Sequence, residues 1–127
     1  MSGRLVNAAA LVGLLLAGCT VERDWRLYPT DAAAGSPVLE GHMVGHGNLH
    51  GVADLTMPDG ELLHGDYTIV AGGAASIFAL GNEGHGTAVL RGASGLTVQC
   101  DFSNNNSLGH GYGTCRSSKG AVYKLIY

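Results

Sequence analysis

The sequence predicts an all-β fold: an antiparallel sheet of repeated hairpins, curled or partly closed into a small barrel. From Val38 onward, short runs that alternate apolar and polar residues are bounded by glycines, as in half-buried strands. No stretch in this region carries the apolar stripe of an amphipathic helix. A hairpin-like unit also occurs three times. We therefore expect about six or seven strands around a small core, with a fully closed barrel as the alternative.

The repeated unit has the pattern of a β-hairpin. Each unit starts with His-Gly, has a second glycine nine positions after the first, and has an aromatic residue seven positions further on. The middle glycine follows residues that favour a reverse turn, such as Pro58-Asp59 before Gly60. The units are His50-Gly51, Gly60 and Tyr67; His85-Gly86, Gly95 and Phe102; and His110-Gly111, Gly120 and Tyr127.

The amino-terminal segment has the features of an export signal. Arg4 precedes an apolar run that starts at Leu5 and ends in the small residues Ala17-Gly18, followed by Cys19. The sequence Leu-Ala-Gly-Cys resembles the lipobox of bacterial lipoproteins. The resemblance implies a diacylglyceryl thioether on Cys19, cleavage before this residue, and acylation of the new amino terminus. The alternative is an ordinary signal peptide or a short membrane anchor with an incidental cysteine.

These features divide the chain into three parts. We expect a lipoprotein signal peptide over residues 1–18, a lipidated cysteine and tether over 19–37, and a glycine-rich β domain over 38–127. The tether is predicted because Pro29, the alanines at 32–34 and Pro37 interrupt any periodic pattern. Removal of residues 1–18 leaves 109 of the 127 residues, which is enough for one small domain.

The other two cysteines predict a disulfide. Cys100 and Cys115 remain after Cys19 is assigned to the lipid, and both fall on the apolar faces of neighbouring predicted strands. Disulfides persist in exported proteins. We therefore expect a Cys100–Cys115 bond, with two free thiols as the alternative.

Charge and motifs exclude several functions. The chain has a net charge of −3 and scattered basic residues, so we expect no nucleic-acid partner. No Gly-x-Ser-x-Gly motif is present, and Gly45-x-Gly47 is not followed by the Lys-Ser/Thr of a phosphate-binding loop. We therefore expect neither an enzyme nor a bound cofactor.

The repeat histidines His50, His85 and His110 are weak candidates for a metal site. Imidazole binds zinc, copper and nickel. However, neighbouring strands are about 4.8 Å apart and successive units are two strands apart, whereas zinc ligands lie within roughly 3.5 Å of one another. The alternative is that these histidines cap the starts of strands. His42, His46 and His50 also recur every fourth residue, but steps of about 13 Å along a strand are too long for one ion.

Two further resemblances concern the domain itself. The first unit, with His50-Gly51, Pro58-Asp59-Gly60 and Gly65-Asp66-Tyr67, distantly resembles MORN-type hairpin repeats, which implies hairpin structure. The stretches 57–61 and 109–115 resemble a group of small uncharacterised bacterial lipoproteins, a resemblance that implies no known activity.

Together these features predict a lipid-anchored cell-envelope protein with a structural or interaction role. Its partners would be the membrane, through the lipid on Cys19, and an envelope protein. A metal- or small-ligand-binding envelope lipoprotein that uses the repeat histidines is the alternative. Thr20 is not the aspartate associated with retention in the inner membrane, so we expect the outer membrane, facing the periplasm.

Overall fold

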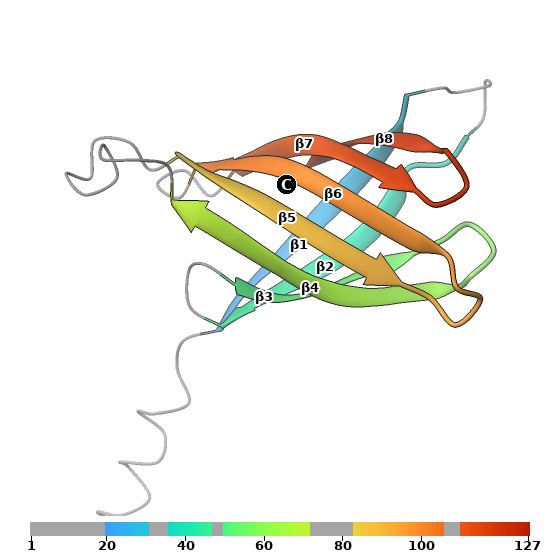
Figure 1. Cartoon of the computed structure of the whole chain (residues 1–127), viewed down its shortest axis with the longest axis horizontal. Helices are drawn as coiled ribbons and strands as arrows, with labels where there is room; N and C mark the ends of the chain where they lie inside the picture. The colour runs from blue at the N-terminus through green and yellow to red at the C-terminus, as the bar shows by residue number, and fades with distance from the viewer. Residues whose placement is uncertain (1–19, 31–35, 47–49, 72–82, 106–109) are drawn as a thin grey trace, which may run out of the picture.

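The computed structural model describes residues 20–30, 36–46, 50–71, 83–105 and 110–127. This part of the chain forms eight β-strands (Figure 1). They are β1 (Thr20–Pro29), β2 (Leu39–His46), β3 (His50–Thr56), β4 (Leu62–Ala71), β5 (Glu83–Arg91), β6 (Thr97–Asn105), β7 (His110–Ser117) and β8 (Val122–Ile126).

The strands form a closed, up-and-down barrel. Each strand pairs with the next in antiparallel orientation, and β1 closes the barrel by pairing with β8. The predicted all-β fold of repeated hairpins is therefore confirmed in its closed form, with more strands than the six or seven expected. The predicted signal peptide and Cys19 lie outside the described residues.

The first strand corrects the predicted domain boundary. The sequence predicts a tether up to residue 37, but residues 20–29 form β1, which pairs with β2 along most of its length. Trp25 and Leu27 of this strand are fully buried. The barrel domain therefore includes residues 20–29, upstream of the predicted start at Val38, because alternate side chains of β1 complete the core.

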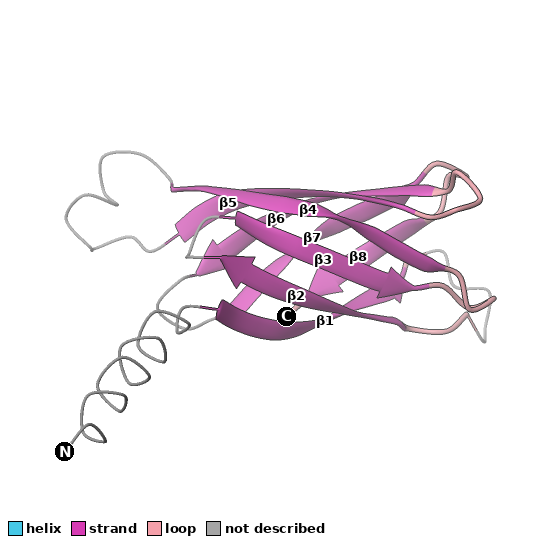
Figure 2. Ribbon diagram, turned by 90° about the horizontal axis from the view of Figure 1, so that it is seen from below, coloured by secondary structure: helices cyan, strands magenta, loops and turns pink. Residues whose placement is uncertain are grey.

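The three predicted turns are tight turns at one end of the barrel, which we call the turn end (pink in Figure 2). Gly60, Gly95 and Gly120 have φ angles of 90°, 90° and 92°. Glycine adopts this left-handed conformation without the steric cost that other residues pay. The constant position of the middle glycine in each unit thus reflects the turn geometry. Thr20 starts β1 at the opposite end, which we call the Thr20 end.

The first glycine and the aromatic residue of each unit are partners across the hairpin. Gly51 faces Tyr67 and Gly86 faces Phe102 in the strand register. Gly111 exchanges both backbone hydrogen bonds with Tyr127, at 3.1 Å each. A Cβ atom on any of these glycines would collide with the aromatic ring opposite. The repeat therefore encodes an aromatic ring packed over a glycine in the neighbouring strand.

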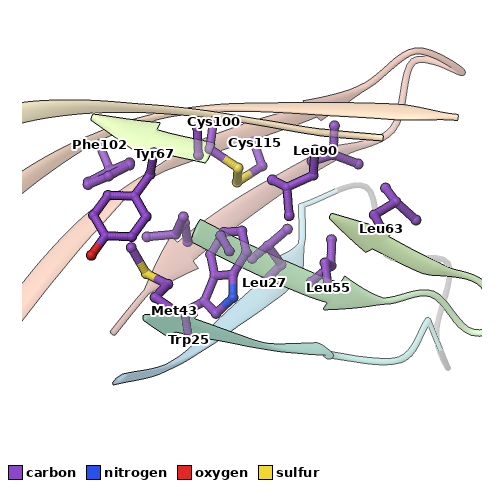
Figure 3. Packing of buried hydrophobic residues seen from close by; sticks show 14 of the residues in the cluster. Trp25, Leu27, Met43, Leu55, Leu63, Tyr67, Leu90, Cys100, Phe102 and Cys115 are labelled. Carbon is purple, nitrogen blue, oxygen red and sulfur yellow. A yellow bond between two sulfur atoms is a disulfide. The ribbon is translucent and has the colours of Figure 1, made fainter. Parts of the chain in front are cut away.

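Apolar side chains fill the interior of the barrel, which we call the lumen (Figure 3). Leucines dominate near the turn end, where Leu27, Leu55, Leu63 and Leu90 are fully buried. The predicted Cys100–Cys115 disulfide is present and joins directly opposed residues of β6 and β7 inside the lumen. The outward-facing positions of the strands carry mostly polar side chains.

Candidate functional site

The structure does not bring the repeat histidines together. His50, His85 and His110 are exposed and lie on β3, β5 and β7 near the Thr20 end. An intervening strand separates each from the next, which places them about 10 Å apart or more. Within the described ranges, no group of three or more His, Cys, Asp or Glu side chains is placed to hold a metal ion.

His42, on the outer surface of the barrel, has polar contacts with residues of both neighbouring strands. Its Nδ1 lies 2.8 Å from Oδ1 of Asp24 on β1, and its Nε2 lies 3.7 Å from Oε2 of Glu22. The backbone N–H of His42 donates to the carboxylate of Asp54 on β3 at 3.1 Å. The hydrogen bond to Asp24 raises the pKa of His42 above its usual 6.5, and the charges of Asp24, Glu22 and Asp54 act in the same direction.

These residues belong to a row of alternating acids and bases across neighbouring strands. In the register, Asp24 faces His42, His42 faces Asp54, and Asp54 faces His64. Opposite charges directly across a strand pair stabilise a sheet modestly. The side chains in this row are partly or fully exposed, so the row is a charged outer surface and not an enclosed site.

A second polar group, for which the sequence alone gave no prediction, lies at the Thr20 end of the lumen. It consists of Arg23 on β1, Tyr67 on β4, Asn104 on β6 and Tyr127 after β8, and we call it the lumen cluster. Arg23 shares the inward register of Trp25 and Leu27 and faces the buried Met43 on β2. Tyr67 and Asn104 are 8% and 6% exposed. Four separate parts of the barrel wall therefore direct polar groups into one mouth of the barrel.

Contacts within the lumen hold one side of this cluster in place. The hydroxyl of Tyr127 donates a hydrogen bond to Oδ1 of Asn104. The ring of Tyr127 packs edge-to-face on Phe102, with centroids 5.8 Å apart and an interplanar angle of 85°. Tyr127 is also fixed by its backbone pairing with Gly111. These contacts give the Tyr127–Asn104 pair a defined position in the wall of the mouth.

The two tyrosines share an electrostatic environment. Burial raises the pKa of Tyr127 to about 12 and also raises that of Tyr67, while the positive charge of Arg23 opposes both shifts. The hydroxyl of Tyr67 makes no hydrogen bond within the described structure, yet it is not a buried unsatisfied group, so solvent reaches it. Figure 3 shows this hydroxyl directed away from the leucine-rich part of the core. Both tyrosines therefore stay protonated at neutral pH.

Two of these residues could not be recognised from the sequence as facing the lumen. Arg23 lies in the predicted tether, and Asn104 lies in the asparagine run 104–106, a composition typical of a loop. The alternation Val98, Cys100, Phe102 continues to position 104, so a longer β6 places Asn104 inside the barrel. Tyr67 and Tyr127 are visible as repeat positions, but the repeat pattern alone indicates no role for their hydroxyls.

The described part of the chain includes no helix with the length and apolar character needed to cross a membrane. Comparisons with protein-family models, with curated proteins and with solved structures find no match to this chain. Residues and geometry are therefore the basis for a functional proposal.

Proposed function

We propose that this protein is a lipid-anchored component of the cell envelope that acts as an interaction module. The observation that carries the proposal is that the lipobox-like cysteine is adjacent in the sequence to the first described strand of the barrel. Cys19 directly precedes Thr20, and Thr20 is the first residue of β1. A lipid on Cys19 would thus be attached without a tether, and it would hold the Thr20 end of the barrel at the membrane.

Two further features agree with an envelope location. The Cys100–Cys115 bond is of the kind that persists in an oxidising compartment such as the periplasm. Thr20 in place of an aspartate after the cysteine favours the outer membrane, facing the periplasm. In this arrangement the three tight turns face away from the bilayer and the mouth with the lumen cluster faces towards it.

The interaction role is supported by segregated charge on the outer surface. The described outward side chains of β1–β4 include one arginine and five acids, namely Glu22, Asp24, Glu40, Asp54 and Asp66. Those of β5–β8 include one acid, Asp101, and the basic residues Arg91, Arg116 and Lys124. Fields of opposite sign on two faces orient a charged partner on approach.

The outward side of β1–β4, which we call the acidic face, also has a hollow that could accommodate a side chain of a partner. A shallow hollow of about 480 Å³ lies over β2–β4, with Val44 and Val52 beside the carboxylates of Asp54 and Asp66. Val52 is 45% exposed. Exposed aliphatic groups surrounded by polar residues are common features of protein contact surfaces. This face therefore fits a basic surface of an envelope protein.

The lipid anchor is tested by metabolic labelling. Cells expressing the chain are grown with labelled palmitate, and incorporation is compared with that in the Cys19→Ser variant. We expect labelled protein in the outer-membrane fraction and loss of label in the variant. Unchanged mass and membrane retention in Cys19→Ser would show that residues 1–19 act as an ordinary signal or anchor segment.

The interaction role is tested by photo-crosslinking in intact cells. A photoreactive residue replaces Val52 on the acidic face or Val89 on the opposite face; both side chains are about half exposed. We expect a discrete crosslinked product from position 52, lost when Asp54 and Asp66 are both replaced by Asn. No product from either position would argue against an interaction role while leaving the anchor result intact.

A further inference from the structure

We propose that the lumen cluster is a binding site for an oxyanion group, either a carboxylate or a phosphate, at the Thr20 end of the barrel. Arg23 and Tyr67 are the binding residues, and the Tyr127–Asn104 pair positions the wall beside them. The inference goes beyond the interaction role and does not depend on the lipid anchor.

The hydrogen-bond donors and the positive charge of the cluster favour an anionic ligand. A guanidinium group only donates hydrogen bonds, and a protonated tyrosine hydroxyl donates one. Among the described side chains that face the lumen from the eight strands, Arg23 is the only charged one. The positive charge of Arg23 acts on both tyrosine hydroxyls. A bound oxyanion would therefore receive charge-assisted hydrogen bonds from one side of the mouth, with no described carboxylate in the lumen to repel it.

The apolar surroundings of the cluster limit the size of the ligand. Buried apolar groups lie next to the cluster: Met43, Ile69 and Phe102 are 4%, 7% and 4% exposed. These apolar groups border the inner side of the site, whereas the Arg23 side chain on its outer side is exposed to solvent. Deeper in the barrel, leucines and the disulfide fill the lumen. The site therefore accepts an anionic group at the mouth and has no described space for a large ligand below it.

The mouth of a barrel is a common place for ligand sites, because polar groups from several strands meet there beside an apolar interior. Arg23 is itself largely exposed, and solvent reaches the Tyr67 hydroxyl. An anion can therefore approach from outside without opening the barrel. The anionic group could belong to a soluble ion or to a phospholipid headgroup, and the two sources share the same oxyanion chemistry.

The proposal is tested on the purified full chain, ¹⁵N-labelled and held in a non-ionic detergent. Inorganic phosphate and acetate are titrated in one arm, and mixed micelles of the same detergent with phosphatidylglycerol or phosphatidylcholine in a second arm. We expect saturable NMR shifts at the Arg23 side chain and the Tyr67 backbone amide. Shifts with the soluble ions indicate a soluble ligand, and shifts only with phosphatidylglycerol indicate a lipid headgroup.

Matched variants separate the site from general charge effects. Arg23→Gln should weaken binding at least about tenfold and Tyr67→Phe several-fold, because each removes a hydrogen bond to a charged ligand. Arg26→Gln is the control, since Arg26 lies on the same strand but faces outward beside Glu40. Because Arg23→Gln could disturb folding, Arg23→Lys is measured in parallel and should retain binding. No saturable shift in either arm, or equal losses in Arg23→Gln and Arg26→Gln, would overturn the proposal.

Discussion

At the scale of single residues, His42 shows how the barrel surface couples charge to strand pairing. Its ring lies between carboxylates of β1, and its backbone N–H is bound by Asp54 of β3. The same position therefore links three neighbouring strands. Such exposed interactions contribute little to stability individually, but they set the protonation state of the imidazole.

We expect the stability contributed by His42 to depend on pH. Its pKa is raised in the folded state, mainly by the hydrogen bond to Asp24, so folding favours the protonated ring. The contribution is fully present below the ordinary pKa of 6.5 and is lost as the pH rises through the raised value. Urea unfolding of wild type and His42→Gln between about pH 5 and 9 should show a wild-type advantage only at the acidic side.

An NMR titration of the imidazole checks the cause of this shift. Asp24→Asn should lower the pKa of His42 towards its ordinary value, because the main hydrogen bond then lacks a charged acceptor. Asp66→Asn is the control, since Asp66 is not among the groups that shift His42. An unchanged His42 pKa in Asp24→Asn would mean that the contact at 2.8 Å does not persist in solution.

At the scale of elements, two kinds of glycine shape each hairpin for different reasons. Gly95 in the β5–β6 turn has a φ of 90°, and a Cβ atom at this position would have no other atom within 4 Å. Gly86 on β5 lacks this backbone constraint, but a Cβ there would collide with the ring of Phe102. One glycine is thus required by conformation and the other by packing.

Alanine substitutions should distinguish these two reasons. Gly95→Ala should cost about 1–2 kcal/mol through backbone strain, and Gly95→Asn should cost less because Asn tolerates this conformation. Gly86→Ala should cost about 1–3 kcal/mol because the Phe102 ring must move. Free energies of unfolding from denaturant titrations provide the measurement.

A double-mutant cycle provides the control for the packing argument. Phe102→Leu in the Gly86→Ala background should recover part of the loss, giving a coupling of at least about 0.5 kcal/mol. The same Phe102→Leu change should be additive with Gly95→Ala, because the turn is distant from the ring. Additive behaviour at Gly86 as well would refute the proposed packing of the ring over this glycine.

The same hairpin elements explain what the sequence could and could not predict. The three forward units are visible because a glycine precedes its aromatic partner by 16 residues, as in Gly51 and Tyr67. The first hairpin has the same separation in reverse order, since Trp25 precedes and faces Gly41. Its longer, proline-containing connection resembles a tether, which conceals β1 and with it Arg23. The lumen cluster depends on side chains that meet only when β1 closes the barrel, which local patterns do not report.

At the scale of the whole molecule, the disulfide should contribute substantially to stability. Cys100 and Cys115 are 15 positions apart, and closing such a loop is worth about 3 kcal/mol in the chain-entropy model. The variant with both cysteines replaced by Ala should lose roughly this free energy of unfolding. Reduction of the wild-type protein should give a similar loss, and reductant should not affect the variant. An unchanged unfolding midpoint after verified reduction would contradict the prediction.

Closure of the barrel depends on β1, which pairs with both β2 and β8. A chain of residues 20–127 should fold, whereas a chain of residues 38–127, which starts at the boundary predicted from the sequence, should not. Without β1, the buried Trp25 and Leu27 are lost and the pairing edges of β2 and β8 are open. Near-UV circular dichroism and NMR dispersion report the outcome. A well-dispersed spectrum from residues 38–127 would instead support the tether interpretation.

Two substitutions within the longer chain separate the two contributions of β1. Trp25→Ala should cost about 3–5 kcal/mol, because it empties a large part of the core and removes the indole N–H bond to the Asp54 carbonyl at 2.9 Å. Arg26→Ala, on the outward face of the same strand, should cost less than about 1 kcal/mol. If both substitutions cost little, β1 would stabilise the barrel mainly through backbone pairing, and its side chains would not be the reason that the domain needs this strand.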